Sequence, residues 1–346
     1  MKFYRLLLVF IAVLIGIVLI SLNSTCKKQD AKRVAKDDSE ALDGMDQSLF
    51  TIRYRPKWHP QAQFAGTYMA HKKGFYKNYG LNVETQPVTP DDHSLSHLIQ
   101  GNSDIILIDL LTALKAYNDS TRLVNLAQVS QNISIMLVAK KSRGINSIGD
   151  FNGKKIGLWQ SGALSVTELF LKQNSLQMEI VPINWSVSLF LQDAVDVINV
   201  MRYNEYHQLI QAGLTESELF TVSLSDKMAP IPEEGFYTTK AFYEKYPRQC
   251  QAFAEATMDG WMYALSNQAE TIDTVLEIMN QAKIRANRPH QEWMLSKMKD
   301  VIMADPQNIG KLTRKGFNDT VKLVQTYTGR RINISYEEFV PHAGQD

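Results

Sequence analysis

Two histidines, His93 and His97, lie four residues apart in a segment of helical character. This spacing puts two imidazoles on one helix face, where they could bind a metal ion. No acidic residue or cysteine follows at a suitable spacing, so we expect a solvated helix face and no metal. Enzyme signatures are also missing, because residues 152–155 lack the rest of a phosphate-binding loop and neither GxGxxG nor GxSxG occurs. This pattern favours a binding protein over an enzyme.

A possible anion site lies at residues 160–163, where the chain enters an expected helix. The first backbone N–H groups of a helix have no partner within it, and its dipole is positive at that end. Ser161 and Gly162 would therefore suit a phosphate, sulfonate or carboxylate group. Alternatively, Ser161 is only the cap of this helix.

Three glutamates could present carboxylates to a ligand. Glu205 lies at an expected strand-to-helix junction, where it either faces a ligand or stabilises the first turn of its own helix, with Asn204 as N-cap. Glu233 and Glu234 follow two prolines that stiffen the chain and precede Gly235, which allows a turn. One of these two acids could be held at the mouth of a cleft, while the other faces solvent.

Short apolar strands alternate with helical segments, which predicts an α/β fold with largely parallel sheets. In the first series we expect strands at 105–108, 123–129 and 133–139, with a helix at 110–117. In the second series we expect strands at 155–158, 179–183, 195–200 and 219–223, with helices at 163–174, 188–193 and 203–212. From residue 239 to about 328 the pattern is helical, and these helices should pack on the first lobe.

This order of elements predicts two doubly wound lobes joined by a hinge of two crossings, near 140–144 and 226–232. The first lobe would consist of residues 48–140 and 229–346, and the second of residues 141–228. A ligand would bind between the lobes, at strand C-termini and helix N-termini.

The N-terminal segment, residues 1–26, predicts a position outside the cytosol. Residues 6–22 are apolar apart from Gly16 and Ser21 and follow two positive charges, as in a signal peptide or a signal anchor. Cys26 follows in a sequence similar to a relaxed bacterial lipobox. Two alternatives stay open: a lipid on Cys26, or a retained membrane helix with an incidental cysteine. Residues 27–47 are charged and have little to bury, which predicts a solvated tether.

Composition narrows the class of partner. The 37 basic and 36 acidic residues nearly balance, so we expect no basic face and no nucleic acid. About 300 residues follow the tether, which is enough for two lobes with separate cores. Cys250 lies in a helical segment and should be buried packing rather than a disulfide partner.

Residues 58–83, WHPQAQFAGTYMAHKKGFYKNYGLNV, combine an extended start, a helix with the small residues Ala65, Gly66 and Ala70, and a strand after Gly80. This segment resembles the opening of the NMT1/THI5-like, SsuA-type solute-binding proteins, where it forms one wall of the ligand cleft. Three other segments are similar to the same family: GKKIGLW at 153–159, MRYNEY at 201–206 and PIPEEGFY at 230–237. The resemblance covers residues 52–328.

The resemblance implies a type II periplasmic binding protein fold and an extracytoplasmic solute-binding protein of an ABC importer, with a permease as partner and no cofactor or catalytic residue. The ligand would be a hydroxymethyl- or formylamino-pyrimidine, a precursor of thiamin. Glu205 would accept hydrogen bonds from its amino edge, and Ser161 with Gly162 would receive an anionic substituent. The other ligand-binding residues would be Trp58, Tyr68 and Tyr203 around the ring, and Trp159, Asn204, Glu233 and Glu234.

Two alternatives to this function remain open. An enzyme of thiamin pyrimidine synthesis would need a cofactor-binding lysine and a histidine donor, for which Lys57 and His59 are the candidates. The THI5 synthases carry that histidine where this chain has Phe64, and also a cysteine-rich motif that this sequence lacks. The second alternative is a binding protein for an alkanesulfonate, taurine or nitrate-like solute, and Glu205 argues against it because a carboxylate repels an anion.

Overall fold

The computed structural model describes residues 48–89, 93–118, 120–159, 166–184, 186–329 and 331–342. The predicted signal segment, Cys26 and the charged tether lie outside these residues, as do Ser161 and Gly162. Within the described ranges, no helix combines the length and the apolar character needed to cross a bilayer.

The first five-stranded sheet combines strands from both ends of the described chain. Its strand order is β2, β1, β3, β10 and β4. Their bounds are Leu81–Thr85, Phe50–Arg55, Ile105–Asp109, Glu234–Thr239 and Leu123–Gln128, respectively. β1 is parallel to β2 and β3, whereas β10 is antiparallel to β3 and β4. This sheet forms the centre of the first lobe.

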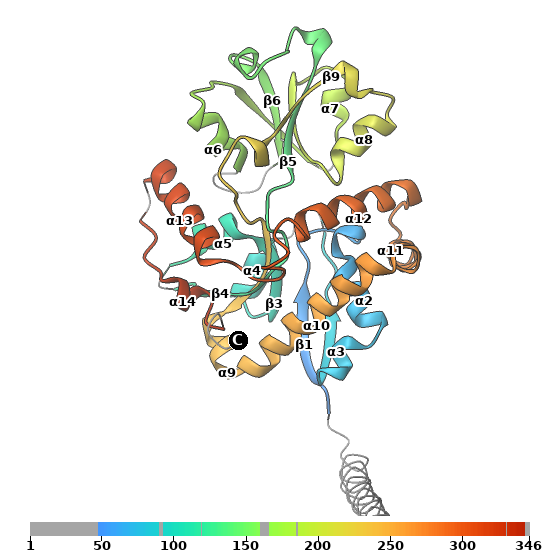
Figure 1. Cartoon of the computed structure of the whole chain (residues 1–346), viewed down its shortest axis with the longest axis vertical. Coiled ribbons are helices and arrows are strands. Elements are labelled where there is room, and N and C mark those ends of the chain that lie inside the picture. The colour runs from blue at the N-terminus through green and yellow to red at the C-terminus, as the bar shows by residue number, and fades with distance from the viewer. Residues whose placement is uncertain are drawn as a thin grey trace, which may run out of the picture. The chain divides into compact units, whose positions relative to one another are not determined.

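The second sheet repeats this arrangement in the order β7, β6, β8, β5 and β9. Their bounds are Glu179–Ile183, Lys155–Trp159, Val197–Met201, Ile135–Lys140 and Leu219–Ser223. β6 is parallel to β7 and β8, and β5 is antiparallel to β8 and β9. Figure 1 shows β5, β6 and β9 in one lobe with α6, α7 and α8, and β1, β3 and β4 in the other.

The chain crosses between the lobes at 129–134, between β4 and β5, and at 224–233, between β9 and β10. The second crossing contains the predicted hinge 226–232. The first crossing was predicted at 140–144, and this is wrong, because β5 pairs with β8 and β9 of the second sheet rather than with the first. An apolar run predicts a strand but not the sheet that the strand joins.

The prediction of largely parallel sheets is correct for four of the five strands of each sheet, which run in one direction. The exceptions are β10 and β5, since each is antiparallel to both of its neighbours. A strand that arrives from the other lobe enters the sheet in the opposite direction. β10 itself was not predicted, because Gly235, its second residue, was expected to form a turn.

Helices flank both sheets. The first lobe contains α2 (Ala65–Lys72), α3 (Phe75–Asn78), α4 (Ser94–Ile99) and α5 (Leu110–Ala116), and the second contains α6 (Val166–Gln173), α7 (Ser188–Leu191) and α8 (Glu205–Gln211). The C-terminal helices are α9 (Lys240–Lys245), α10 (Pro247–Ser266), α11 (Gln268–Gln281), α12 (Arg288–Ile302), α13 (Arg314–Thr328) and α14 (Tyr336–Phe339). As predicted, they return to the first lobe, where α10 packs on α2 and α3 and α13 on α5.

The packing of α10 on α2 requires two glycines. A Cβ added to Gly66 would lie 2.3 Å from the ring of Trp261, and one added to Gly260 would lie 2.1 Å from the carbonyl oxygen of Gly66. The small residues of α2 therefore allow the close packing predicted for them. The turn just before α2 is held from another side, since the side-chain oxygen of Gln291 in α12 accepts a hydrogen bond from Ala62 N at 2.8 Å.

Candidate functional site

A cavity of about 320 Å³ lies between the two lobes. Its lining comes from the loop after β1, from the ends of β3, β6 and β8, from the first turns of α4, α5 and α8, and from both crossings. The cavity therefore lies where the sequence predicted a ligand site, at strand ends and first turns of helices between two lobes.

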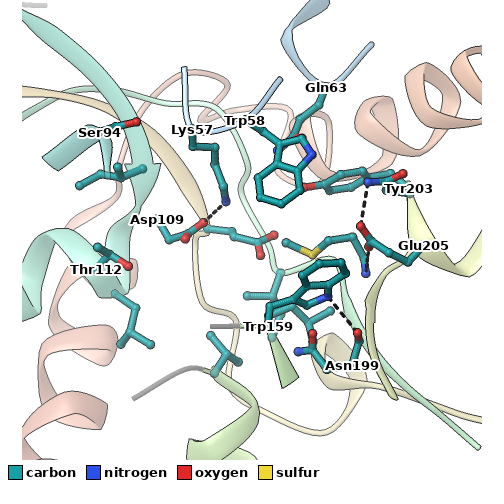
Figure 2. Close-up of a pocket in the computed structure, with 18 of the residues that line it drawn as sticks. Lys57, Trp58, Gln63, Ser94, Asp109, Thr112, Trp159, Asn199, Tyr203 and Glu205 are labelled. Carbon is teal, nitrogen blue, oxygen red and sulfur yellow. Dashed lines mark hydrogen bonds and ion pairs between the residues drawn. The ribbon is translucent and has the colours of Figure 1, made fainter. Parts of the chain in front are cut away.

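Two tryptophans, one from each lobe, form the aromatic part of the cavity. Trp58 belongs to the loop after β1, and Trp159 is the last residue of β6. Their ring centroids lie 6.1 Å apart with the planes at 88°. The indole N–H of Trp159 donates to the carbonyl oxygen of Asn199 at 3.1 Å, which fixes the ring. Figure 2 shows the Trp58 indole beside Tyr203 and the Trp159 indole beside Asn199. A planar ligand ring would find apolar faces here.

Glu205 is the first residue of α8, lines the cavity and is 5% exposed. Its Oε2 accepts a hydrogen bond from Met201 N, and its Oε1 accepts one from Asn204 Nδ2, both at 2.8 Å. Burial raises the pKa of Glu205 to about 7. Glu205 therefore joins the start of α8 to the end of β8 and also lines the cavity, and its contact with a ligand stays a prediction. Asn204 makes no side-chain cap bond.

A charged cluster lies at the first-lobe side of the cavity. Lys57 Nζ lies 2.6 Å from Asp109 Oδ1 and 3.0 Å from Glu234 Oε1. Glu233, which is 4% exposed, accepts a hydrogen bond on Oε2 from Ser134 N at 3.0 Å. The three carboxyl groups of this cluster outnumber its lysine, so they compete for one cation.

The pKa values of the cluster follow from burial and from these charges. Burial and the nearby Asp109 carboxylate raise the pKa of Glu233 above its usual range, and Lys57 offsets only part of this. Burial by itself would lower the pKa of Lys57. The charges of Asp109 and Glu234 outweigh that effect, so the pKa of Lys57 lies above its ordinary value. Lys57 is therefore a protonated, paired cation.

Besides the contact between Trp58 and Trp159, a second contact joins the two lobes beside the cavity, where α8 of the second lobe meets α12 of the first. The ring of His207 lies nearly parallel to those of His290 and Trp293, with centroids 5.2 and 4.8 Å away. His290 Nδ1 lies 2.9 Å from His207 Nδ1, and its Nε2 lies 3.0 Å from Asn204 Oδ1. Because the Asn204 amide N–H₂ donates to Glu205, this contact is linked to a carboxylate of the cavity.

A family model described as NMT1/THI5 like matches residues 61–271, which is more than half of the chain. The protein belongs to the NMT1/THI5-like family. One similar protein is the "Putative binding protein YtlA" of Bacillus subtilis, 22% identical over 228 residues, or 62% of this chain and 66% of YtlA. Another is the "Putative thiamine biosynthesis protein" of Haemophilus influenzae, 23% identical over 252 residues, or 68% of this chain and 80% of that protein. The chain thus spans just under two thirds of YtlA.

Solved structures agree on the fold. The periplasmic aliphatic sulphonate binding protein SsuA from Escherichia coli is similar with a TM-score of 0.62 at 14% identity, covering 85% of this chain and 98% of SsuA. A protein from Bordetella bronchiseptica reaches a TM-score of 0.64 at 15% identity, covering 80% of this chain and 89% of its own. The NMT1/THI5-like chain therefore has the type II periplasmic binding protein fold that its sequence predicted.

In this NMT1/THI5-like protein, the structure brings six of the predicted site residues to one cavity. They are Trp58, Trp159, Tyr203, Asn204, Glu205 and Glu233. That these residues contact a ligand stays a prediction.

Tyr68 does not fit its predicted place around the ligand. It lies in α2, is 8% exposed and packs in the core of the first lobe, outside the described lining of the cavity. The reason is that α2 is covered by α10, so the first two turns of α2 are enclosed by protein. The helix pattern identified a buried aromatic residue but not what buries it.

The structure also separates the two adjacent acids of the second crossing. Glu233 lines the cavity, whereas Glu234, the first residue of β10, is 1% exposed and lies behind the lining. Its Oε1 accepts hydrogen bonds from Gln63 Nε2 and from the Tyr203 hydroxyl, the latter at 3.4 Å, and pairs with Lys57. The expectation that one of the two acids faces solvent is wrong. Adjacent residues of an extended segment point to opposite sides, and both sides are covered here.

Asp109 and Asn199 line the cavity but were not predicted as site residues, and Lys57, which also lines it, was a candidate only for an enzyme. Asp109 ends β3 directly before α5, so the rule that strand C-termini face the cleft could have found it. Asn199 is a single amide within the apolar strand β8, and a polar residue in such a run is itself a signal.

Proposed function

We propose that this protein is the extracytoplasmic solute-binding component of an ABC importer, and that its ligand is an aminopyrimidine of the thiamin-precursor class, such as hydroxymethyl- or formylamino-pyrimidine. One observation carries the proposal: two tryptophans and a buried carboxylate, Glu205, line one cavity between two lobes. The names of similar proteins support it, since one structure is titled a ligand-binding component of an ABC-type import system and one relative is named for thiamine biosynthesis.

The edge of an aminopyrimidine is complementary to Glu205. It presents an amino group beside a ring nitrogen, which is one donor and one acceptor unless the ring is protonated. Each oxygen of Glu205 accepts one bond from the protein and keeps a lone pair for a ligand. A proton on either the ring or the carboxyl group completes two hydrogen bonds. Because burial raises the pKa of Glu205 to about 7, this proton is available near neutral pH.

The cations of the cavity argue against an anionic solute. Among the described lining residues, Lys57 is the one lysine and no arginine is present, and Lys57 is already paired with Asp109. A sulfonate or nitrate group would therefore lose its hydration without gaining an unpaired lysine or arginine from this lining. A neutral ring would not.

The state of Lys57 argues against an enzyme of pyrimidine synthesis. A lysine that forms a Schiff base with a cofactor must lose its proton to become a nucleophile. The pKa of Lys57 lies above its ordinary value because of Asp109 and Glu234, so it keeps the proton. Phe64, at the position of the family's histidine, is buried in the core of the first lobe.

The proposal includes a position outside the cytosol, with a lipid on Cys26 or a retained N-terminal helix holding the protein at the membrane and presenting the closed lobes to a permease. Mass spectrometry of the native protein should find either an acylated N-terminus at Cys26 or an N-terminus still at Met1. A chain that starts elsewhere and carries no lipid would contradict both forms of the anchor.

The ligand class can be tested without assuming it. Denaturing mass spectrometry should detect an aminopyrimidine carried through purification. Calorimetry should then show one-to-one binding of hydroxymethyl-aminopyrimidine and none of taurine. Trp58→Ala should weaken pyrimidine binding by about 10-fold to 100-fold through lost ring contact, while Tyr79→Ala, which removes an exposed aromatic residue, should not. Binding of taurine without the pyrimidine would favour the sulfonate alternative instead.

A further inference from the structure

The contact between α8 and α12 leads through a buried amide to a carboxylate of the cavity. Asn204 Nδ2 donates to Glu205 Oε1 at 2.8 Å, and Asn204 Oδ1 lies 3.0 Å from His290 Nε2. Asn204 and Glu205 belong to the second lobe, whereas His290 belongs to α12, which packs on the first. Each of the three residues is 8% exposed or less. Buried polar groups of this kind must be matched donor to acceptor.

The ionised carboxylate decides which atoms of this chain donate. A carboxylate only accepts, so the Asn204 amide turns its N–H₂ toward Glu205 and its oxygen toward His290. His290 is neutral near neutral pH, because burial and the nearby His207 lower its pKa to about 4. Its single N–H is therefore on Nε2 and donates to Asn204. His290 Nδ1 then accepts from the N–H of His207 Nδ1, 2.9 Å away.

His290 is the more rigid of the two donors to the Asn204 oxygen. The other donor is Gln208 Nε2, at 2.9 Å, from a half-buried side chain of the same helix. A glutamine amide can present either its N–H₂ or its oxygen, so Gln208 can follow Asn204 when that amide turns. The ring of His290 is held by His207, and its backbone N–H donates to Asn287, the N-cap of α12.

We infer that His290 is a positioning residue for ligand recognition: from the first lobe it orients the Asn204 amide, which in turn holds Glu205 for the edge of the ligand. Glu205 therefore keeps its geometry only while α12 lies against α8. A ligand that binds Glu205 favours the arrangement in which the lobes are in contact. The effect on binding rests on the proposed pyrimidine function, whereas the hydrogen bonds can be tested without a ligand.

Trp293 supplies a matched control, because it joins the same two helices by other contacts. Its indole N–H donates to the carbonyl oxygen of Arg202 at 3.0 Å, and its ring packs on the core of the second lobe. Trp293→Phe keeps an aromatic ring and removes this hydrogen bond. It should weaken the contact between the lobes while His290 still donates to Asn204.

The first measurement needs neither a ligand nor a substitution. Nitrogen-15 NMR of the imidazole rings, at about pH 8 where Glu205 is ionised, should show His290 protonated on Nε2 and His207 on Nδ1. The opposite tautomers would overturn the inference, because His290 could then not donate to Asn204.

The second measurement follows the pKa of Glu205 by carbon-13 NMR of its carboxyl group, in the parent, His290→Leu, His290→Gln and Trp293→Phe. Leucine has no donor, so the Asn204 amide is free to turn and the pKa of Glu205 should rise by about 0.5. Glutamine keeps an N–H and should restore the parent value, and Trp293→Phe should leave it unchanged. Lys57, whose charge lowers the pKa of Glu205, is present in all four proteins. Circular dichroism checks their folding.

The third measurement is calorimetric titration of the same four proteins with hydroxymethyl-aminopyrimidine. His290→Leu should weaken binding by about 5-fold to 30-fold, and His290→Gln and Trp293→Phe by about 3-fold or less.

An unchanged pKa of Glu205 in folded His290→Leu, or an equal rise in Trp293→Phe, would overturn the inference, because His290 would then only help to hold the lobes together. So would full binding by His290→Leu when the parent binds the pyrimidine. If His290→Leu does not fold, the tautomers in the parent decide. If the pKa rises as expected but the folded parent binds no aminopyrimidine, the pyrimidine function fails and the positioning of Glu205 stands.

Discussion

Replacing Glu205 by glutamine removes the charge at the centre of the proposed site and keeps the side chain's shape. Met201 N donates to Oε2 and Asn204 Nδ2 donates to Oε1, so in either orientation of the new amide one donor faces another donor. Asn204 cannot relieve this by turning its own amide. Its Oδ1 accepts from Gln208 Nε2 at 2.9 Å and lies 3.0 Å from His290 Nε2.

The size of the effect follows from these contacts. A hydrogen bond to a charged group contributes about 1.5 to 3 kcal/mol, and a buried donor left unpaired costs about 1 to 3 kcal/mol. The variant loses the charge assistance at the ligand edge, and its amide can match only part of that edge. We expect a total loss of about 2 to 4 kcal/mol in binding, which corresponds to roughly 30-fold to 1,000-fold weaker affinity.

The assay is calorimetric titration with hydroxymethyl-aminopyrimidine, using the parent, Glu205→Gln and Glu179→Gln. Glu179 is a suitable control because it lies in β7 of the same lobe and its side chain is 65% exposed. Circular dichroism should show that each variant is folded. If folded Glu205→Gln binds within about 3-fold of the parent, the carboxylate does not recognise the pyrimidine and the reasoning fails.

Three further predictions concern stability and motion. The pKa of Glu205 rises from 4.5 to about 7 on folding, so the folded state holds a proton that the unfolded chain releases, and stability falls as the pH rises through this window. Urea titrations give the unfolding free energy of the parent and of Glu205→Gln at each pH. The parent's value minus the variant's value should fall by about 3 kcal/mol as the pH rises from 4.5 to about 7. A difference that does not change with pH would contradict this. Gly66→Ala should lower the unfolding free energy by about 1 to 3 kcal/mol or more, because the added Cβ would meet the ring of Trp261. Gly149→Ala is the control and should change the unfolding free energy little, because its added Cβ would lie 3.7 Å from the nearest atom. Equal losses in the two variants would refute the packing argument. Saturating pyrimidine should reduce the radius of gyration in small-angle scattering, and an unchanged radius would count against hinge closure.

Much of the secondary structure could be predicted because its signals are local. Strands β7 and β9 match the expected ranges 179–183 and 219–223, and α5 differs from its prediction by one residue. Short apolar runs between glycines and polar turns are sufficient for such elements. The segment before β10 was harder, because its prolines and glutamates mark a crossing and conceal the strand that starts at Glu234.

The candidate site was partly predictable for a related reason. Trp159 ends a strand and Glu205 begins a helix, and both positions face the cleft in a two-lobed α/β fold, so a local motif was enough to select them. Tyr68 lay in an equally suggestive motif, yet it packs in the core of the first lobe. Whether an aromatic residue in a helix meets a ligand or another helix depends on the element that covers it, and α10 is far away in the sequence.

By itself, the sequence determined the α/β class, the alternation of elements and the family, since each depends on residue types at short spacing. The tertiary structure alone decided that β5 belongs to the second sheet, that Glu233 rather than Glu234 lines the cavity, and that Lys57 is neutralised by Asp109. These three facts depend on contacts between segments far apart in the chain. Burial and pairing of charges arise only when those segments meet, and no local pattern records which of them will.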